Sequence, residues 1–146
     1  MKRPAAVLLV DDNPADLDLI REAFDKEQGI TISAVSDGME AVGFLRRQDK
    51  YAGVAIPDLV MLDLNLPKKD GRAVLTEIKS DPNLRRVPVV VFSTSEAQFD
   101  VGRSYELGAN SYVRKPGNLP DFSATVRSIR DFWLGCAYPP PRRNGE

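Results

Sequence analysis

Acidic, hydroxyl and ammonium side chains follow successive apolar runs of this sequence, and all of them suit phosphate or metal chemistry. They are Asp11 and Asp12 after residues 7–10, Asp63 after 59–62, Ser93 and Thr94 after 87–92, and Lys115 after 111–113. Carboxylates brought together repel one another unless a cation lies among them or one is protonated. Oxygen ligands without histidine or cysteine favour a hard ion, of which Mg²⁺ fits best. The set therefore predicts an Mg²⁺ site that leaves positions for a phosphate oxygen.

The apolar runs alternate with segments of helical spacing. Strands are predicted near 7–10, 31–35, 59–62, 87–92 and 111–113, because each run is short and mostly apolar and most are rich in β-branched residues. Asn13-Pro14 starts the first helix and Gly29 ends it, and the last two helices are expected over about 96–107 and about 119–133. The alternation predicts an α/β fold with helices on both faces of a parallel sheet. In such sheets the site lies at the carboxyl ends of the strands, where the polar residues fall.

Length and composition limit the classes of protein that remain. The chain has 146 residues, 42% apolar and 28% charged, so we expect one domain over 1–137 and a proline-led, extended or disordered tail over 138–146. It has no histidine, which excludes histidine acid–base catalysis, and the single Cys136 excludes an intrachain disulfide. A formal charge of −1 and the lack of any run of about 18 apolar residues argue against nucleic-acid and membrane binding. A cytoplasmic location is expected.

Four segments together resemble the receiver domain of two-component response regulators. They are Val10-Asp11-Asp12-Asn13, residues 61–67 with Asp70-Gly71, residues 92–95 and residues 111–116. The resemblance extends over roughly 6–133. It implies a flavodoxin-like fold, a doubly wound five-stranded parallel sheet of order 2-1-3-4-5. It also implies a signalling protein, not an enzyme, that takes a phosphoryl group from a phosphohistidine of a sensor histidine kinase.

The resemblance assigns the phosphoacceptor and the metal ligands. Asp63 stands at the position of the central carboxylate that accepts the phosphoryl group in this family. Asp12, Asp63 and the Asn65 backbone carbonyl are implied to bind Mg²⁺ directly, and Asp11 to bind it through a water. Asn65 and Ser95 lie two residues beyond the acceptor and the switch hydroxyl, so both are expected to affect slow autodephosphorylation.

Three further residues complete the implied switch. Lys115 is expected to pair with the phosphate as a point charge and to be held in place by a cis Lys115–Pro116 bond. Ser93 occupies the position whose hydroxyl rotates toward the phosphate. Tyr112 matches the aromatic residue that moves inward when that hydroxyl moves.

Residues 92–95, 110–112 and 131–134 are similar to those of single-domain regulators paired with cyanobacterial and bacterial phytochromes. This likeness implies a bacteriophytochrome as the sensor kinase and output through protein contacts. The last helix carries more apolar surface than one face of a sheet needs. We therefore expect Trp133, Leu134 and the segment to Tyr138 to form a homodimer interface.

Two other interpretations fit parts of the same pattern. A haloacid-dehalogenase-like phosphatase also uses an Asp after a strand together with Mg²⁺, but it needs a second Asp where Asn65 stands. A pseudo-receiver would bind a partner without being phosphorylated, and it would be expected to have lost acids or the lysine. Taken singly, Asp12 would be a helix cap and Lys115-Pro116 a turn. The ordered set is what indicates a phosphoryl site.

Overall fold

A computed structural model of the chain describes residues 4–24 and 29–141. Its strands are β1 (Ala5–Val10), β2 (Ile30–Val35), β3 (Leu59–Leu62), β4 (Val89–Ser93) and β5 (Ser111–Arg114). Its helices are α1 (Pro14–Phe24), α2 (Gly38–Leu45), α3 (Gly71–Ser80), α4 (Gln98–Glu106) and α5 (Leu119–Asp131). A 3-10 turn, η1 (Asp49–Tyr51), and a π-helical turn, η2 (Phe132–Cys136), are shorter. Strands and helices alternate as the sequence predicts.

The five strands form one parallel sheet of order β2-β1-β3-β4-β5. In its register Val10 lies beside both Val35 and Leu62, and Leu62 lies beside Val91. The strands therefore end at one common edge, and the residues that follow them are brought together there. This confirms the predicted fold class and strand order.

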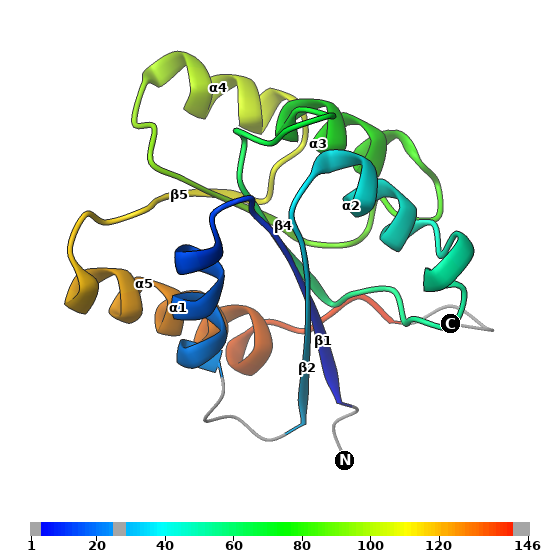
Figure 1. Cartoon of the computed structure of the whole chain (residues 1–146), viewed down its shortest axis with the longest axis horizontal. Helices are drawn as coiled ribbons and strands as arrows, with labels where there is room; N and C mark the ends of the chain where they lie inside the picture. Colours follow the sequence, from blue (N-terminus) through cyan, green and yellow to red (C-terminus); the bar gives the residue numbers. More distant parts are fainter. Residues whose placement is uncertain (1–3, 25–28, 142–146) are drawn as a thin grey trace.

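The central strands are buried on both faces. Successive side chains of a strand point to opposite sides, so each strand contributes to the core on either face of the sheet. Leu8 and Val10 pack on the face covered by α2 and α3, whereas Val7 and Leu9 pack on the face covered by α1 and α5. Figure 1 shows α2, α3 and α4 on one side of the strands and α1 and α5 on the other. Each apolar run of the sequence thus contributes to two cores.

Polar side chains begin four of the helices. The caps are Asn13 for α1, Asp37 for α2, Asp70 for α3 and Asn118 for α5. The residue before α4 is Ala97, which makes no side-chain cap and has an extended backbone, with φ −63° and ψ 130°. Helix α4 accordingly begins at Gln98, two residues after the predicted start.

The end of the last helix differs from the sequence prediction. The last helix is regular only to Asp131, and the chain then widens into η2, where the Ala137 N–H donates to the Phe132 carbonyl at 2.7 Å. The described part of α1 ends at Phe24. Gly29, the predicted stop, has a φ of 81°, a left-handed backbone that glycine adopts without strain; residues 25–28 lie outside the described part.

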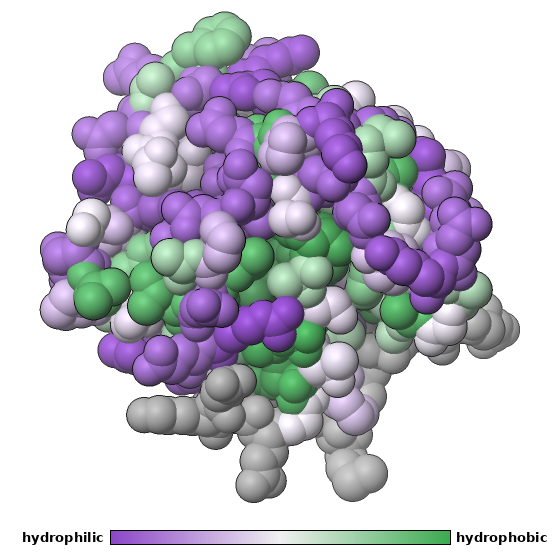
Figure 2. All heavy atoms as spheres, in the orientation of Figure 1, coloured by the Kyte–Doolittle hydropathy of each residue, from purple (hydrophilic) through white to green (hydrophobic). Residues whose placement is uncertain are grey.

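Residues 138–141 follow η2 without regular secondary structure, and residues 142–146 of the predicted tail lie outside the described part. The Pro141 carbonyl accepts a hydrogen bond from the Arg86 guanidinium at 3.0 Å. In the described residues no helix has the length and apolar character needed to cross a membrane. Figure 2 shows mostly hydrophilic side chains over α2, α3 and α4, whereas apolar side chains gather lower in the same view, around α1, α5 and the strands.

Candidate functional site

The polar residues singled out by the sequence lie at the carboxyl edge of the sheet. Asp11 follows β1, Asp63 follows β3, Ser93 ends β4 and Lys115 follows β5; all four are buried. Asp12 is exposed beside them. One carboxylate oxygen from each of Asp11, Asp12 and Asp63 lies within 4.8 Å of the other two. The predicted convergence of these side chains is confirmed.

The Lys115 ammonium lies among these acids. Its Nζ is 2.7 Å from Asp11 Oδ2, 2.9 Å from Asp16 Oδ2 and 3.0 Å from Asp63 Oδ2. An ammonium has three N–H donors, and here each has a carboxylate oxygen to accept it. Four carboxylates, with Asp12, therefore surround one cation, and the edge of the sheet keeps an excess of negative charge.

Burial and pairing shift the pKa values of two of these groups. Burial raises the pKa of Asp11, and the hydrogen bonds from Lys115 and the Asn13 N–H oppose this only in part. Burial acts to lower the pKa of Lys115, but its hydrogen bonds with Asp11 and Asp16 outweigh that effect and the pKa is raised. Lys115 therefore stays charged at every physiological pH.

Asp16 is a member of the site that the sequence analysis missed. It follows no strand but lies in the first turn of α1, where its N–H donates to Asn13 Oδ1 at 3.1 Å. An acid at this helical position commonly accepts a hydrogen bond from the N–H of the cap residue. Here the Asn13 N–H donates to Asp11 Oδ1 at 2.9 Å instead, so Asp16 is left to bind Lys115. The spacing of Asn13 and Asp16 was the available signal.

The loop after Asp63 is packed closely against the start of α3. The Asn65 N–H donates to Asp63 Oδ1 at 3.2 Å, and the Gly71 N–H donates to the Leu64 carbonyl at 2.9 Å. A Cβ on Gly71 would lie 2.3 Å from the Asp63 carbonyl oxygen, so this position accepts no side chain. These contacts fix the direction of the Asp63 carboxylate. The role of the Asn65 carbonyl as a metal ligand stays a prediction.

The hydroxyl groups near the end of β4 belong to a chain of contacts. The buried Ser93 Oγ accepts a hydrogen bond from the Ser95 N–H at 3.3 Å, and the Tyr112 hydroxyl donates to the Ser95 carbonyl at 2.8 Å. Ser95 Oγ donates to Asp100 at 2.6 Å, and Asp100 also pairs with Arg72 of α3. The Ser95 and Arg72 contacts hold the pKa of Asp100 below its usual value. The loop after β4 is thereby connected to β5, α4 and α3.

The expected cis bond before Pro116 is wrong. No peptide bond in the described residues is cis, so Lys115–Pro116 is trans. Trans is the intrinsically preferred form even before proline. Lys115 is positioned by its backbone instead, because its N–H donates to the Ser93 carbonyl at 2.7 Å as a continuation of the sheet.

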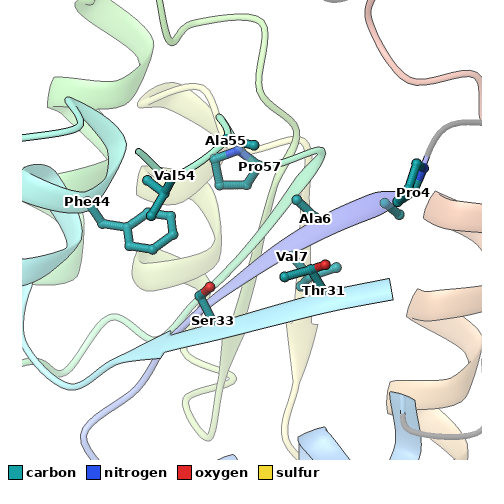
Figure 3. Close-up of a pocket in the computed structure, with 10 residues that line it drawn as sticks. Pro4, Ala6, Val7, Thr31, Ser33, Phe44, Val54, Ala55 and Pro57 are labelled. Atoms are coloured by element: carbon teal, nitrogen blue, oxygen red, sulfur yellow. The ribbon is translucent and has the colours of Figure 1, made fainter. Parts of the chain in front are cut away.

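The opposite end of the sheet has a different character. A hollow of about 270 Å³ lies beside the amino-terminal halves of β1 and β2 (Figure 3). Its lining is mostly apolar and includes Ala6, Phe44, Val54 and Pro57, with the Thr31 side chain beside them. None of the charged residues of the carboxyl edge lines this hollow.

The carboxylate cluster fits a hard divalent cation. Its three oxygen donors are the ligand type that Mg²⁺ prefers, and Mg²⁺ needs only one or two carboxylates because it keeps several waters. Asp12 is open to solvent, which provides a route of entry. The charge of the site also favours a cation, since Lys115 neutralises only part of it.

Comparison with known proteins gives the family. The chain matches the model of the response regulator receiver domain over residues 7–127, which include every site residue described above. It is 47% identical over 133 residues to the response regulator Rcp1 of Synechocystis, with 90% of each chain covered. It is 42% identical over 134 residues to the probable methanogenesis regulatory protein FilR2 of Methanothrix harundinacea, covering 90% of this chain and 85% of that protein.

Solved structures give the same assignment. The phosphorylated cyanobacterial phytochrome response regulator RcpA matches with a TM-score of 0.92 and 48% identity, over 94% of this chain and 99% of its own. The Mn²⁺-bound form of Rcp1 matches with a TM-score of 0.91 and 44% identity, over 94% and 100%. The amide of Asn65 is not the acid that the phosphatase interpretation requires. The chain belongs to the response regulator receiver domain family and is similar to its phytochrome-associated members.

Proposed function

We propose that this receiver accepts a phosphoryl group from a phosphohistidine of a sensor histidine kinase onto Asp63. Mg²⁺ would be bound directly by Asp12, Asp63 and the Asn65 backbone carbonyl, and through a water by Asp11. The observation that carries the proposal is the setting of Asp63. Its carboxylate lies 3.0 Å from the Lys115 ammonium and in one cluster with two other carboxylates. At this position the Lys115 ammonium and a cation held by the carboxylates would neutralise the negative charge of an incoming phosphoryl group.

The transfer would be an in-line displacement. An Asp63 oxygen attacks phosphorus, the P–N bond to the histidine breaks, and its electron pair returns to the imidazole, leaving an aspartyl phosphate. A bound Mg²⁺ would supply charge neutralisation at the phosphoryl oxygens. Lys115 would exchange a carboxylate partner for a phosphoryl oxygen and hold it as a point charge. Asn65 and Ser95, beside the acceptor and the switch hydroxyl, would tune slow hydrolysis of the acyl phosphate.

The substitution Asp63→Asn tests this proposal against the pseudo-receiver alternative. Wild type, Asp63→Asn and Asp18→Asn are incubated with acetyl phosphate and Mg²⁺, and intact mass spectrometry detects the added phosphoryl group. Asp18 is the matched control because it is an exposed aspartate on α1. We expect labelling of the wild type and of the control, none of Asp63→Asn, and none in a chelator. Acid-labile phosphate on Asp63→Asn would contradict the acceptor, and an unlabelled wild type would favour the pseudo-receiver.

Ser93 and Tyr112 would report the phosphorylated state. The phosphoryl group adds about −1.5 to −2 charges. The Ser93 hydroxyl would rotate to donate to it and give up its contact with the Ser95 N–H, and Tyr112 would move inward and leave the Ser95 carbonyl. Both present contacts involve Ser95, so the two movements share one loop. Phosphorylation would thereby shift a pre-existing equilibrium.

A bacteriophytochrome is the kinase that we propose as phosphodonor. RcpA is a cyanobacterial phytochrome response regulator, and the bacteriophytochrome response regulator AtBRR matches this chain with a TM-score of 0.74 and 36% identity. A phosphotransfer profile tests the choice. Purified, phosphorylated sensor kinases of the host are mixed with this protein, and transfer from a phytochrome kinase is expected to be fastest. A faster transfer from another kinase would overturn it.

We propose that signalling proceeds through protein contacts and that η2 contributes to a homodimer. Phe132 is 52% exposed and Tyr138 is almost fully exposed. Trp133 and Leu134, by contrast, are half-buried against the core between the sheet and α1 and α5, so only part of their surface is available to a partner. The Phe132 and Trp133 rings lie edge to face with centroids 5.2 Å apart, and exposed apolar groups of this kind are typical of a protein interface.

Light scattering tests the dimer. The wild type is expected to be dimeric at high concentration, and Phe132→Ser is expected to weaken the dimer because it removes apolar surface at η2. Phe99→Ser is the matched control, since Phe99 is 75% exposed on α4, away from η2. A wild type that stays monomeric with and without phosphorylation would rule out the interface.

A further inference from the structure

We propose that Asp16 is a positioning residue that raises the affinity of the site for its divalent cation by holding the Lys115 ammonium while the cation takes the carboxylates of Asp11 and Asp63. The inference rests on the proposed Mg²⁺-dependent function of the same site. It concerns a residue of α1 that follows no strand and lies outside the four segments on which the family resemblance rests.

The three carboxylates bound to Lys115 are not equivalent. Asp11 and Asp63 belong to the cluster that can hold a metal ion, together with Asp12. Asp16 is outside that cluster, although its Oδ2 lies 2.9 Å from the Lys115 ammonium. Two of the three partners of the ammonium are therefore groups that a cation would claim, and one is not.

Asp16 is held where it can keep this contact. Its N–H is bonded to the Asn13 side chain at the start of α1, so its backbone belongs to the first turn of a capped helix. Its side chain is 21% exposed, compared with 4% for Lys115. It therefore presents its carboxylate to Lys115 from the rim of the site, between solvent and the buried ammonium.

Lys115 and a divalent cation are drawn to the same carboxylates. The ammonium donates to Asp11 and Asp63, and a cation held by Asp63 and, through a water, by Asp11 would repel it and weaken these two contacts. A buried ammonium without a partner is unfavourable. Asp16 supplies a partner that the cation does not take, so it lowers the cost of cation entry. The negative charge of Asp16 also attracts a cation directly. The experiment therefore has to separate this attraction from the contact with Lys115.

Cation titrations of the protein and two variants separate the contact with Lys115 from the effect of charge alone. Mn²⁺ binding is followed by electron paramagnetic resonance, and Mg²⁺ binding is measured by competition, for wild type, Asp16→Asn and Asp18→Asn. We expect Asp16→Asn to weaken both affinities about three- to fivefold, the range of a partly exposed ion pair. Asp18→Asn removes the same charge from the same helix without this contact, and screening should limit its effect to less than about twofold.

A double-mutant cycle tests whether Asp16 acts through Lys115. In a Lys115→Met background, Asp16→Asn should weaken cation binding no more than Asp18→Asn does, because there is no ammonium left to hold. An Asp16→Asn effect of the same size with and without Lys115 would overturn the proposal, as would equal affinities of Asp16→Asn and wild type. Circular dichroism melting confirms that each variant is folded.

The outcome is separable from that of the proposed function. Cation binding is measured without a phosphodonor, so a protein that binds Mn²⁺ but is never labelled on Asp63 disproves phosphoryl transfer and leaves the role of Asp16 standing. Normal labelling with an Asp16→Asn affinity equal to that of the wild type disproves the role of Asp16 alone.

Discussion

Two lysines lie at opposite ends of the sheet and differ in what surrounds them. Lys115, at the carboxyl edge, donates to three carboxylates. Lys79, near the end of α3, lies at the amino ends of β4 and β5 and donates to the Arg85 carbonyl at 3.1 Å, the Val87 carbonyl at 2.8 Å and Asn110 Oδ1 at 3.1 Å. Both ammonium groups have three oxygen partners, but only one set of partners is charged.

The difference in partners reverses the effect of burial. Burial lowers the pKa of Lys79, and within residues 4–24 and 29–141 no carboxylate lies at ion-pair distance from it. Burial acts in the same direction on Lys115, but the carboxylates around it raise its pKa. The direction of the pKa shift of a lysine withdrawn from water therefore depends on whether its partners are charged as well as on desolvation.

The comparison shows which end of the sheet is built for chemistry. Lys79 joins α3 to the segment before β4 and to the start of β5, and its stem lies under Gly108, where an added Cβ would be 2.7 Å from Lys79 Cγ. Each of the three N–H donors of Lys79 has an oxygen partner from the chain itself. The carboxyl edge instead keeps more carboxylates than cations, and this excess of negative charge can be used by a divalent metal ion.

Lys115→Met is expected to have the largest effect. It removes the cation from the acceptor site, so labelling by acetyl phosphate should slow by about 100-fold, a loss comparable with the removal of one catalytic hydrogen-bond donor. Lys79→Met should be labelled at the rate of the wild type at a temperature where both are folded. Rates come from mass spectra taken at intervals. A fast Lys115→Met or a slow Lys79→Met would contradict the division between the two ends.

Lys79→Met is expected to lower the free energy of unfolding by about 2–3 kcal/mol, because carbonyl groups lose hydrogen bonds from a charged donor. Lys115→Met also leaves buried carboxylates without a counter-ion. Urea denaturation with and without Mg²⁺ distinguishes the two variants. Mg²⁺ should restore much of the stability that Lys115→Met loses, since it binds the same carboxylates, and it should not correct Lys79→Met. If Mg²⁺ restored the stability of both variants, or of neither, the proposed difference between the two ends of the sheet would be wrong.

The sequence allowed the meeting of side chains from separate strands at the carboxyl edge to be predicted. Parallel strands end together, so Asp11, Asp63 and Lys115 had to meet once the strands were located, and they do. No such rule predicted the contacts of Lys79 and Asp16. Lys79 reaches a partner 31 residues away and Asp16 one that is 99 residues away, and both contacts depend on how helices pack on the sheet. Side-chain direction at that level is a tertiary property.

The last helix shows a second limit of the sequence. Its apolar spacing predicted one regular helix to about residue 133, and the spacing holds for Phe122, Val126 and Ile129, which are buried. A five-residue turn then follows, and it places Phe132 outward and Trp133 partly inward. The pattern of apolar residues is compatible with either geometry, so it could not show where α5 ends.

The smallest effect, and the sharpest test of the comparison, is the pH dependence of stability. A lysine with a lowered pKa binds fewer protons in the folded state than in the unfolded state, so its contribution to the unfolding free energy rises as the pH approaches the ordinary value of 10.5. For Lys115, whose pKa is raised, the contribution is complete below 10.5 and falls only above it. Urea denaturation of wild type, Lys79→Met and Lys115→Met is measured from pH 8 to pH 10.5.

The difference between wild type and Lys79→Met should grow with pH over that range, by less than the loss at neutral pH. The difference between wild type and Lys115→Met should stay constant, because Lys115 remains charged in both states until the unfolded chain begins to titrate. If the two differences in unfolding free energy changed with pH in the same way, the partners of the two ammonium groups would not set the direction of their pKa shifts. Opposite slopes to those expected would mean that Lys79 has a charged partner in solution.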